Sequence, residues 1–385
     1  MPGLIGGRGR LMLAPRPDEG DTMRDVEITL VRAAFGEKER EVARFGGLRA
    51  SAFRYDSGVE ALRLSHARGH AIVLPYLGQM VWSAEFDGVG LAMKSLFAEP
   101  RPVNSIVETY GCLAYHSGIL RNGVPGAEDD HALHGEAPCA PMQASGIACG
   151  HDTQGPWIAV TGRREYAVGF GAHYLATPRV VLREGAAAIE IEMNVENLSG
   201  APMDVMYMCH VNFAFPRNAR IVQAAPFTPW HVIARTAIPP FVKASQDYRA
   251  FLREVAADPA RMAVLDEPQR YDPEQVFYVK GARTDARGRA RYLLWREQGD
   301  AFEIAWDAEA MPHTIRWILV NSDIEVAAFA MPGTCEPEGY ASELRKGHVR
   351  ALAGGARLSL ATRVGYLEAA GAEQAAREIE GETAH

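Results

Sequence analysis

Residues 189–196 read IEIEMNVE, and this stretch decides the fold class. Isoleucine, methionine or valine occupies every odd position, and glutamate or asparagine occupies every even one. Because successive side chains of a strand point to opposite faces, one face of this segment is apolar and the other is polar. Such alternation is typical of an antiparallel strand with one face on a core and one face in water.

The same period of two recurs along most of the chain. Residues 79–86 (QMVWSAEF) and 357–366 (RLSLATRVGY) each place large side chains on one face. Many strands separated by turn residues, without alternating helices, predict an all-β fold. We therefore expect a large antiparallel β-sandwich or a β-barrel, with a few short helices. Weaker strand patterns occur at 59–64, 70–74, 157–161, 166–170, 178–183, 205–215, 292–296, 302–306 and 315–320.

A helical pattern is rare and marks the additions to this all-β domain. Residues 245–258 (SQDYRAFLREVAAD) favour a helix with Ser245 as its N-cap, inside a segment, 235–275, that we interpret as an insertion. The Gly-, Pro- and Arg-rich start predicts disorder. We predict a disordered leader at 1–22, a single domain at 23–370 that contains the insertion, and a tail at 371–385.

Composition excludes several classes of protein. The chain has 385 residues, a hydrophobic content of 48% and a formal net charge of −8. An acidic chain lacks the basic face that nucleic-acid binding needs. No run approaches the roughly 18 apolar residues of a transmembrane helix, so no membrane association is expected. Five cysteines without a C-x-x-C pair favour a reduced, cytoplasmic protein over a disulfide framework.

One loop concentrates groups that can carry chemistry. Residues 128–142 read EDDHALHGEAPCAPM, and their glycine and prolines exclude a helix. The segment predicts a rigid loop that presents His131 and His134 at one place. H-x-x-H in a loop, with no third ligand at a clear spacing, is a weak metal signal.

Two further segments carry an imidazole and a carboxylate. In YMCHVNFAFP (207–216), His210 and Asn212 interrupt an apolar strand and share one strand face. In TCEPEGY (334–340), Glu336 follows an apolar run. An imidazole and a carboxylate together can perform general acid–base chemistry near neutral pH.

Each of these residues also has a purely structural interpretation. A single strand histidine such as His210 is more often a hydrogen-bonded core residue, and Glu336 alone fits a loop salt bridge equally well. His116 fits the edge of a sheet as well as a site. Trp82 fits a core position better than a sugar-stacking one.

Taken together, six motifs resemble the aldose 1-epimerase (galactose mutarotase-like) superfamily, and in particular its DUF4432 branch. The resemblance covers roughly residues 60–367 and rests on the order and spacing of the motifs. These motifs are GQMVW at 78–82, MKSLF at 93–97, ETYGCLAYHSGI at 108–119, GVPGAEDDHALHGEAPCAPM at 123–142, MYMCHVNFAFP at 206–216 and CEPEG at 335–339.

The resemblance implies a β-sandwich with a sugar cleft on one broad face. It implies mutarotation, in which a carboxylate takes the C1 hydroxyl proton and an imidazolium protonates the ring oxygen. By motif, Glu336 matches the base, His210 the acid and His134 an assisting residue, and neither metal nor cofactor is required. The residues expected to bind the sugar are His116, His131, Glu136, Lys94, Trp82 and Asn212.

The chain departs from the mutarotase pattern at Glu136, which stands where mutarotases have glycine after His-Gly. With Lys94, this residue leaves the sugar open. We expect a small-molecule carbohydrate as the partner, and a homodimer through sandwich edges is compatible with the pattern. The rival hypotheses are a non-catalytic sugar-binding or regulatory protein on the same fold, and a different isomerase or lyase reaction in the same cleft. A metal among His116, His131 and His134 would favour that different reaction.

Overall fold

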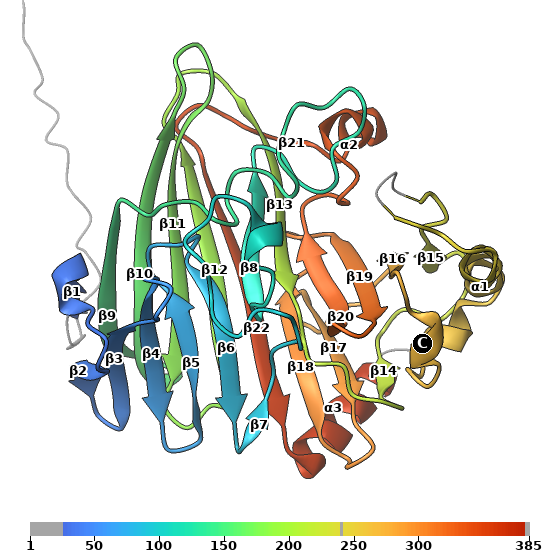
Figure 1. Ribbon diagram of the computed structural model, residues 1–385, viewed down its shortest axis with the longest axis horizontal. Coiled ribbons are helices and arrows are strands. Elements are labelled where there is room, and N and C mark those ends of the chain that lie inside the picture. The colour runs from blue at the N-terminus through green and yellow to red at the C-terminus, as the bar shows by residue number, and fades with distance from the viewer. Residues whose placement is uncertain (1–25, 239–241, 382–385) are drawn as a thin grey trace, which may run out of the picture.

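Two large antiparallel sheets pack face to face in the computed structural model, which describes residues 26–238 and 242–381 (Figure 1). The main hydrophobic core contains side chains from both sheets and lies between them. The predicted all-β sandwich is therefore confirmed. The predicted leader at 1–22 lies outside the described residues.

The first sheet has nine strands, and its centre is formed by the alternating segment of the sequence. Its strands pair in the order β1-β9-β10-β11-β12-β22-β18-β17-β14. Their bounds are β1 Val26–Thr29, β9 Ala144–Asp152, β10 Gly155–Ala167, β11 His173–Arg183, β12 Ala188–Asn197, β14 Arg220–Val222, β17 Arg289–Trp295, β18 Ala301–Asp307 and β22 Arg357–Leu367.

The second sheet has thirteen strands and carries the candidate site. Its main path is β15-β16-β19-β20-β13-β8-β6-β5-β4-β3-β2, while β21 pairs with β13 and β7 with β6. Their bounds are β2 Arg40–Phe45, β3 Leu48–Arg54, β4 Glu60–His66, β5 Gly69–Leu74, β6 Met80–Phe86, β7 Val89–Gly90, β8 Ala114–Ile119, β13 Met203–Val211, β15 Val232–Ala234, β16 Gln275–Val279, β19 His313–Val320, β20 Glu325–Gly333 and β21 Arg350–Leu352.

Strand β12 shows how the sequence pattern becomes the core. Ile189, Ile191, Met193 and Val195 are buried in the main core, while the glutamates between them are only partly covered. Burial of each such aliphatic side chain contributes about 1.5–3 kcal/mol. The strand predicted at 166–170 is wrong beyond Ala167, because the chain turns back there.

The described residues form three α-helices, which lie outside the sandwich (Figure 1). Helix α1 (Gln246–Ala257) begins after Ser245, whose side chain accepts a hydrogen bond from the Tyr248 amide, which confirms the predicted helix and its N-cap. Helix α2 (Tyr340–Lys346) follows β20. Helix α3 (Ala369–Gly381) spans most of the predicted tail and buries four apolar side chains against the end of the first sheet. The 3-10 helices are Arg32–Ala34, Ile106–Glu108, Pro259–Met262 and Pro268–Arg270.

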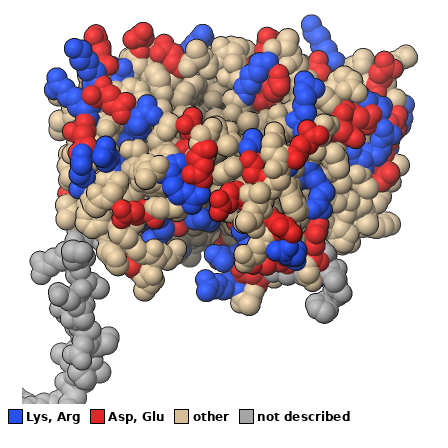
Figure 2. All heavy atoms as spheres, turned by 90° about the horizontal axis from the view of Figure 1, so that it is seen from below, with Lys and Arg blue, Asp and Glu red and all other residues tan. Residues whose placement is uncertain are grey.

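The described surface carries mixed charge, and the cysteines lie inside the fold. Acidic and basic side chains are interspersed on the face seen in Figure 2. All five cysteines are buried, and within the described chain none is in a disulfide. No helix of the described residues is both long and apolar enough to cross a membrane.

Candidate active site

Strand β13 directs its side chains alternately to the core and to the outer face of the second sheet. Tyr207, Cys209 and Val211 are buried in the main core. Met208 and His210 therefore point to the opposite, outer face. The loops at 93–113 and 123–142 cover that face, so His210 is only 3% exposed.

His210 lines a cavity of about 430 Å³ on this outer face. The walls are mainly apolar, and the polar groups are few. Such a combination is typical of small-molecule sites, in which a few polar groups orient the ligand. The lining consists of Leu96, Phe97, Val107, Tyr110, Val124, Leu133, His134, Met208, His210, Arg235, Glu274, Val276, Ile315, Trp317, Ile324, Met331 and Pro337.

Aromatic rings hold His210 in place. Tyr115 stacks on it with ring centroids 4.6 Å apart, and Trp317 meets it edge-on at 5.9 Å. The hydroxyl of Tyr110 lies 3.2 Å from Nε2 of His210. The ring is thus oriented from several sides, which a proton-transferring group requires.

The predicted rigid loop brings His134 to the same cavity. The His134 amide donates to the Gly123 carbonyl at 2.9 Å, and its carbonyl accepts from the Gly118 amide at 2.8 Å. Its backbone is left-handed, with φ of 61°. Its ring meets His210 edge-on, with centroids 5.1 Å apart. The structure therefore brings together His134 and His210, which lie 76 positions apart in the sequence.

Both imidazoles are neutral near pH 7. Burial lowers the pKa of His134 to about 4, with a smaller contribution from His131. Burial also holds the pKa of His210 well below its usual value, and the nearby His134 acts in the same direction. Within the described residues Nδ1 of His134 has no hydrogen-bond partner, and the side chain of Asn212 opposes part of the shift at His210. Each neutral ring keeps a lone pair that can accept a proton.

A charged corner closes the cavity on the side of β16. Arg235 forms an ion pair with Glu274, and Nε1 of Trp317 donates to Glu274 at 2.9 Å. Arg235 also lies 3.6 Å from the carboxylate of Glu338, which accepts from the Tyr278 hydroxyl. The cavity therefore contains a cation, a carboxylate and two imidazoles next to an apolar wall.

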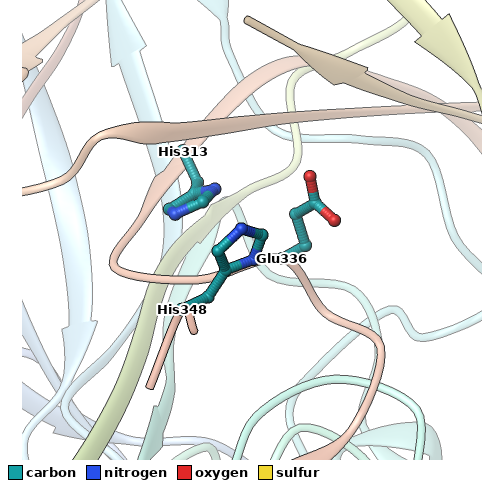
Figure 3. Close-up of side chains that lie close together, drawn as sticks. All are labelled: His313, Glu336 and His348. Atoms are coloured by element: carbon teal, nitrogen blue, oxygen red, sulfur yellow. The ribbon is translucent and has the colours of Figure 1, made fainter. Parts of the chain in front are cut away.

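Glu336 lines a different cavity, of about 310 Å³. Its carboxylate lies 2.7 Å from Nζ of Lys346 and 3.9 Å from Nζ of Lys280. Figure 3 shows the Glu336 side chain beside the imidazoles of His313 and His348. Burial lowers the pKa of His313 to about 4, with a further contribution from His348.

The two cavities adjoin but remain separate. Pro337, directly after Glu336, lines the cavity of His210, whereas Glu336 itself does not. Tyr278 lines the Glu336 cavity, and through Glu338 it is linked to Arg235 in the other. The structure thus does not place the predicted base Glu336 and the predicted acid His210 in one cavity.

Three predicted sugar-binding residues are buried and line neither cavity. His116, 1% exposed, points into the core, where its Nδ1 lies 2.7 Å from the Tyr207 hydroxyl. Asn212 donates its amide to the Cys112 carbonyl at 3.1 Å. Trp82 is buried in an apolar cluster on the outer sheet face.

The other three organise loops. Glu136 accepts from the Leu120 amide at 2.8 Å and from the Tyr174 hydroxyl at 2.9 Å, so it fixes the loop of His134 to both sheets. His131 bonds the neighbouring Ala132 carbonyl at 2.8 Å. Lys94 forms an exposed ion pair with Glu325 at 2.7 Å.

Several residues of the site had no separate signal in the sequence. Tyr110 belongs to the motif at 108–119, but neighbouring residues do not reveal its contact with His210. Arg235 and Glu274 lie near the two ends of the predicted insertion and meet only in three dimensions. Likewise, His313 and His348 are single histidines on either side of Glu336 in the sequence.

Comparisons with known proteins agree with this architecture. The model of a family described as "Domain of unknown function (DUF4432)" matches residues 56–365. A search of curated proteins found no match.

Solved structures with a similar fold share little sequence with the chain. A candidate aldose 1-epimerase from Klebsiella pneumoniae has a TM-score of 0.75 at 14% identity, covering 94% of this chain and 96% of its own. A galactose mutarotase-like protein from Clostridium acetobutylicum has a TM-score of 0.57 at 10% identity, covering 84% and 99%. A candidate aldose 1-epimerase from Escherichia coli K12 has a TM-score of 0.51 at 13% identity, covering 79% and 97%. At these identities the similarity establishes the fold.

Proposed function

The chain belongs to the DUF4432 family, and from this premise we propose that it binds a reducing sugar in the cavity of His210 and interconverts its anomers. The pair of neutral imidazoles, His134 and His210, carries the proposal, because proton transfer needs such groups in a partly closed cavity. The fold shared with candidate aldose 1-epimerases supports the same reaction class.

The chemistry assigns a double role to His210. Neutral His210 takes the proton of the C1 hydroxyl, and the C1–O5 bond of the resulting hemiacetal anion breaks to give an open-chain aldehyde with an O5 alkoxide. The imidazolium formed on His210 returns the proton to O5, so no net proton is gained or lost. Rotation about the C1–C2 bond and the reverse steps give the other anomer.

The low pKa of His210 suits this cycle in both directions. A ring that is neutral at pH 7 is available as the acceptor, and its imidazolium is then a strong acid because burial disfavours the charge. His134 meets the His210 ring edge-on and is placed to donate a hydrogen bond to a sugar oxygen. Arg235 and Glu274 provide polar partners for the remaining hydroxyls.

Polarimetry and NMR exchange spectroscopy on freshly dissolved reducing sugars test the proposal. The wild type should accelerate the anomer exchange of at least one sugar, and His210→Gln should lose about 100-fold or more of that rate, the typical contribution of a general base. His173→Gln on β11 is the matched control, because His173 pairs with Glu165 at 3.0 Å on the other sheet. Full activity in His210→Gln would refute the role of this residue.

A second candidate function is sugar binding without catalysis. The mainly apolar lining favours it, because most of the cavity wall offers contact surface and no proton transfer. Calorimetry separates the two functions: a sugar that binds in the wild type without faster anomer exchange supports the binding protein.

A further inference from the structure

We propose that His313, His348 and Glu336 form a binding site for a divalent transition-metal ion such as Zn²⁺ (Figure 3). Each residue offers one ligand atom, and these three atoms lie within 4.8 Å of one another. Two imidazoles and one carboxylate form a ligand set typical of zinc and of non-haem iron. The site goes beyond the proposed sugar function and does not depend on it.

The backbone brings these three side chains together from separate elements. His313 is the first residue of β19, Glu336 follows β20, and His348 follows helix α2. Strands β19 and β20 pair, and His313 is in register with Gly333, three positions before Glu336. The rings of His313 and His348 have centroids 4.2 Å apart. The two rings therefore lie against each other, close to the carboxylate of Glu336.

A buried carboxylate behind the cluster is the second observation. Glu343 is 0% exposed, and its Oε2 lies 2.7 Å from Nδ1 of His348. Because an ionised carboxylate only accepts, Nδ1 donates and the lone pair of a neutral ring lies on Nε2. Metal-binding histidines commonly donate their other ring N–H to a carboxylate in this way. The same Oε2 accepts from the Glu336 amide at 2.9 Å, so Glu343 positions two of the three ligands.

The separations of the three ligand atoms allow an ion to bind after small movements of the side chains. With metal–nitrogen distances of about 2.1 Å, tetrahedral ligand atoms lie about 3.4 Å apart, so no ligand atom has to shift by more than roughly 0.7 Å. Three protein ligands leave a fourth position open, as in catalytic zinc sites. The cluster lines a cavity of about 310 Å³, which provides room for a water molecule or a ligand oxygen at that position.

Two lysines beside Glu336 provide a further test of the metal site. Lys346 places its ammonium 2.7 Å from both Glu336 and Glu343, and Lys280 lies 3.9 Å from Glu336. Their side chains are 35% and 55% exposed, so both can swing into solvent when a cation binds. Lys346 therefore competes with the metal for Glu336, and its removal should strengthen metal binding.

Titration of chelator-treated full-length protein with Zn²⁺ tests the site. Isothermal calorimetry should find one ion per chain, with affinity reduced at least tenfold in His313→Gln and in His348→Gln. Lys346→Met should bind Zn²⁺ more tightly than the wild type. His173→Gln, with an imidazole on the other sheet, is the control and should bind as the wild type does. Equal affinity in all of these proteins, or no stoichiometric binding, would overturn the site.

A measurement on the wild type covers the case in which a variant fails to fold. In ¹⁵N NMR of the imidazoles, Zn²⁺ should shift the ring-nitrogen signals of two histidines at one equivalent and leave those of His134 and His210 in place. Cobalt should give the visible absorption bands of a low-coordinate site. The absence of any imidazole shift at one equivalent, or a shift of His134 and His210 instead, would refute the assignment.

Discussion

Gly135→Ala tests whether the loop of His134 is held by close backbone packing. Gly135 has φ of +76°, and a Cβ atom there would lie 1.9 Å from the Arg121 carbonyl oxygen. The left-handed backbone costs a non-glycine residue about 1–2 kcal/mol. Relief of the clash must displace backbone, which costs about 1–3 kcal/mol more if it resembles overpacking. We therefore expect Gly135→Ala to lower the free energy of unfolding by about 2–5 kcal/mol.

Gly288 provides a control with the same backbone angle. It also has φ of +76°, but no heavy atom lies within 4 Å of its Cβ position. Gly288→Ala should thus show only the conformational cost, about 1–2 kcal/mol. Urea unfolding followed by circular dichroism measures both variants. Equal losses of stability would refute the close packing at Gly135. Because the neighbouring His134 lines the cavity, Gly135→Ala should also slow any anomer exchange, whereas Gly288→Ala should not.

Two further predictions concern a partly buried carboxylate, Glu136, and a buried imidazole, His116. Glu136→Gln should lower the free energy of unfolding by about 1.5–3 kcal/mol, because the carboxylate of Glu136 accepts hydrogen bonds from Leu120 and Tyr174. Urea unfolding measures this loss, and the exposed Glu85→Gln is the control, for which we expect almost no change. A similar loss in both variants would contradict the prediction. Burial lowers the pKa of His116 to about 4, so the unfolded chain binds more protons between pH 6.5 and 4 and stability falls as the pH falls through that window. This group contributes a loss on the order of 3 kcal/mol, so His116→Gln should flatten the pH dependence measured by urea unfolding, and an unchanged slope would exclude the assignment.

The two cavities contain different chemical groups, although the consecutive residues Glu336 and Pro337 line one cavity each. That of His210 combines neutral imidazoles with apolar contact surface, as expected for a sugar with one apolar face. That of Glu336 combines two imidazoles and a carboxylate, the ligand set of the proposed metal ion, with two lysines that compete with the ion for the carboxylate. If both proposals hold, the Tyr278–Glu338–Arg235 contacts connect a metal site to a sugar site.

The strands and part of the site were predictable from local pattern. The alternation at 189–196 gave β12, and the helix pattern after Ser245 gave α1. The sequence also indicated that His210 lies on a strand and that His134 lies in a rigid loop. These features depend on neighbouring residues, and the spacing of side chains along a strand or helix is the same in every protein.

The residues that meet His210 and Glu336 were decided only by the tertiary structure. Sequence alone paired Glu336 with His210, whereas the folded chain surrounds Glu336 with His313, His348 and two lysines and surrounds His210 with His134 and aromatic rings. The face of each side chain follows from local alternation. Its partners follow from the order of the strands and the paths of the loops, which depend on how the whole chain buries its core. Local pattern therefore determined the strands and the reactive groups, and long-range packing determined which of those groups share a cavity.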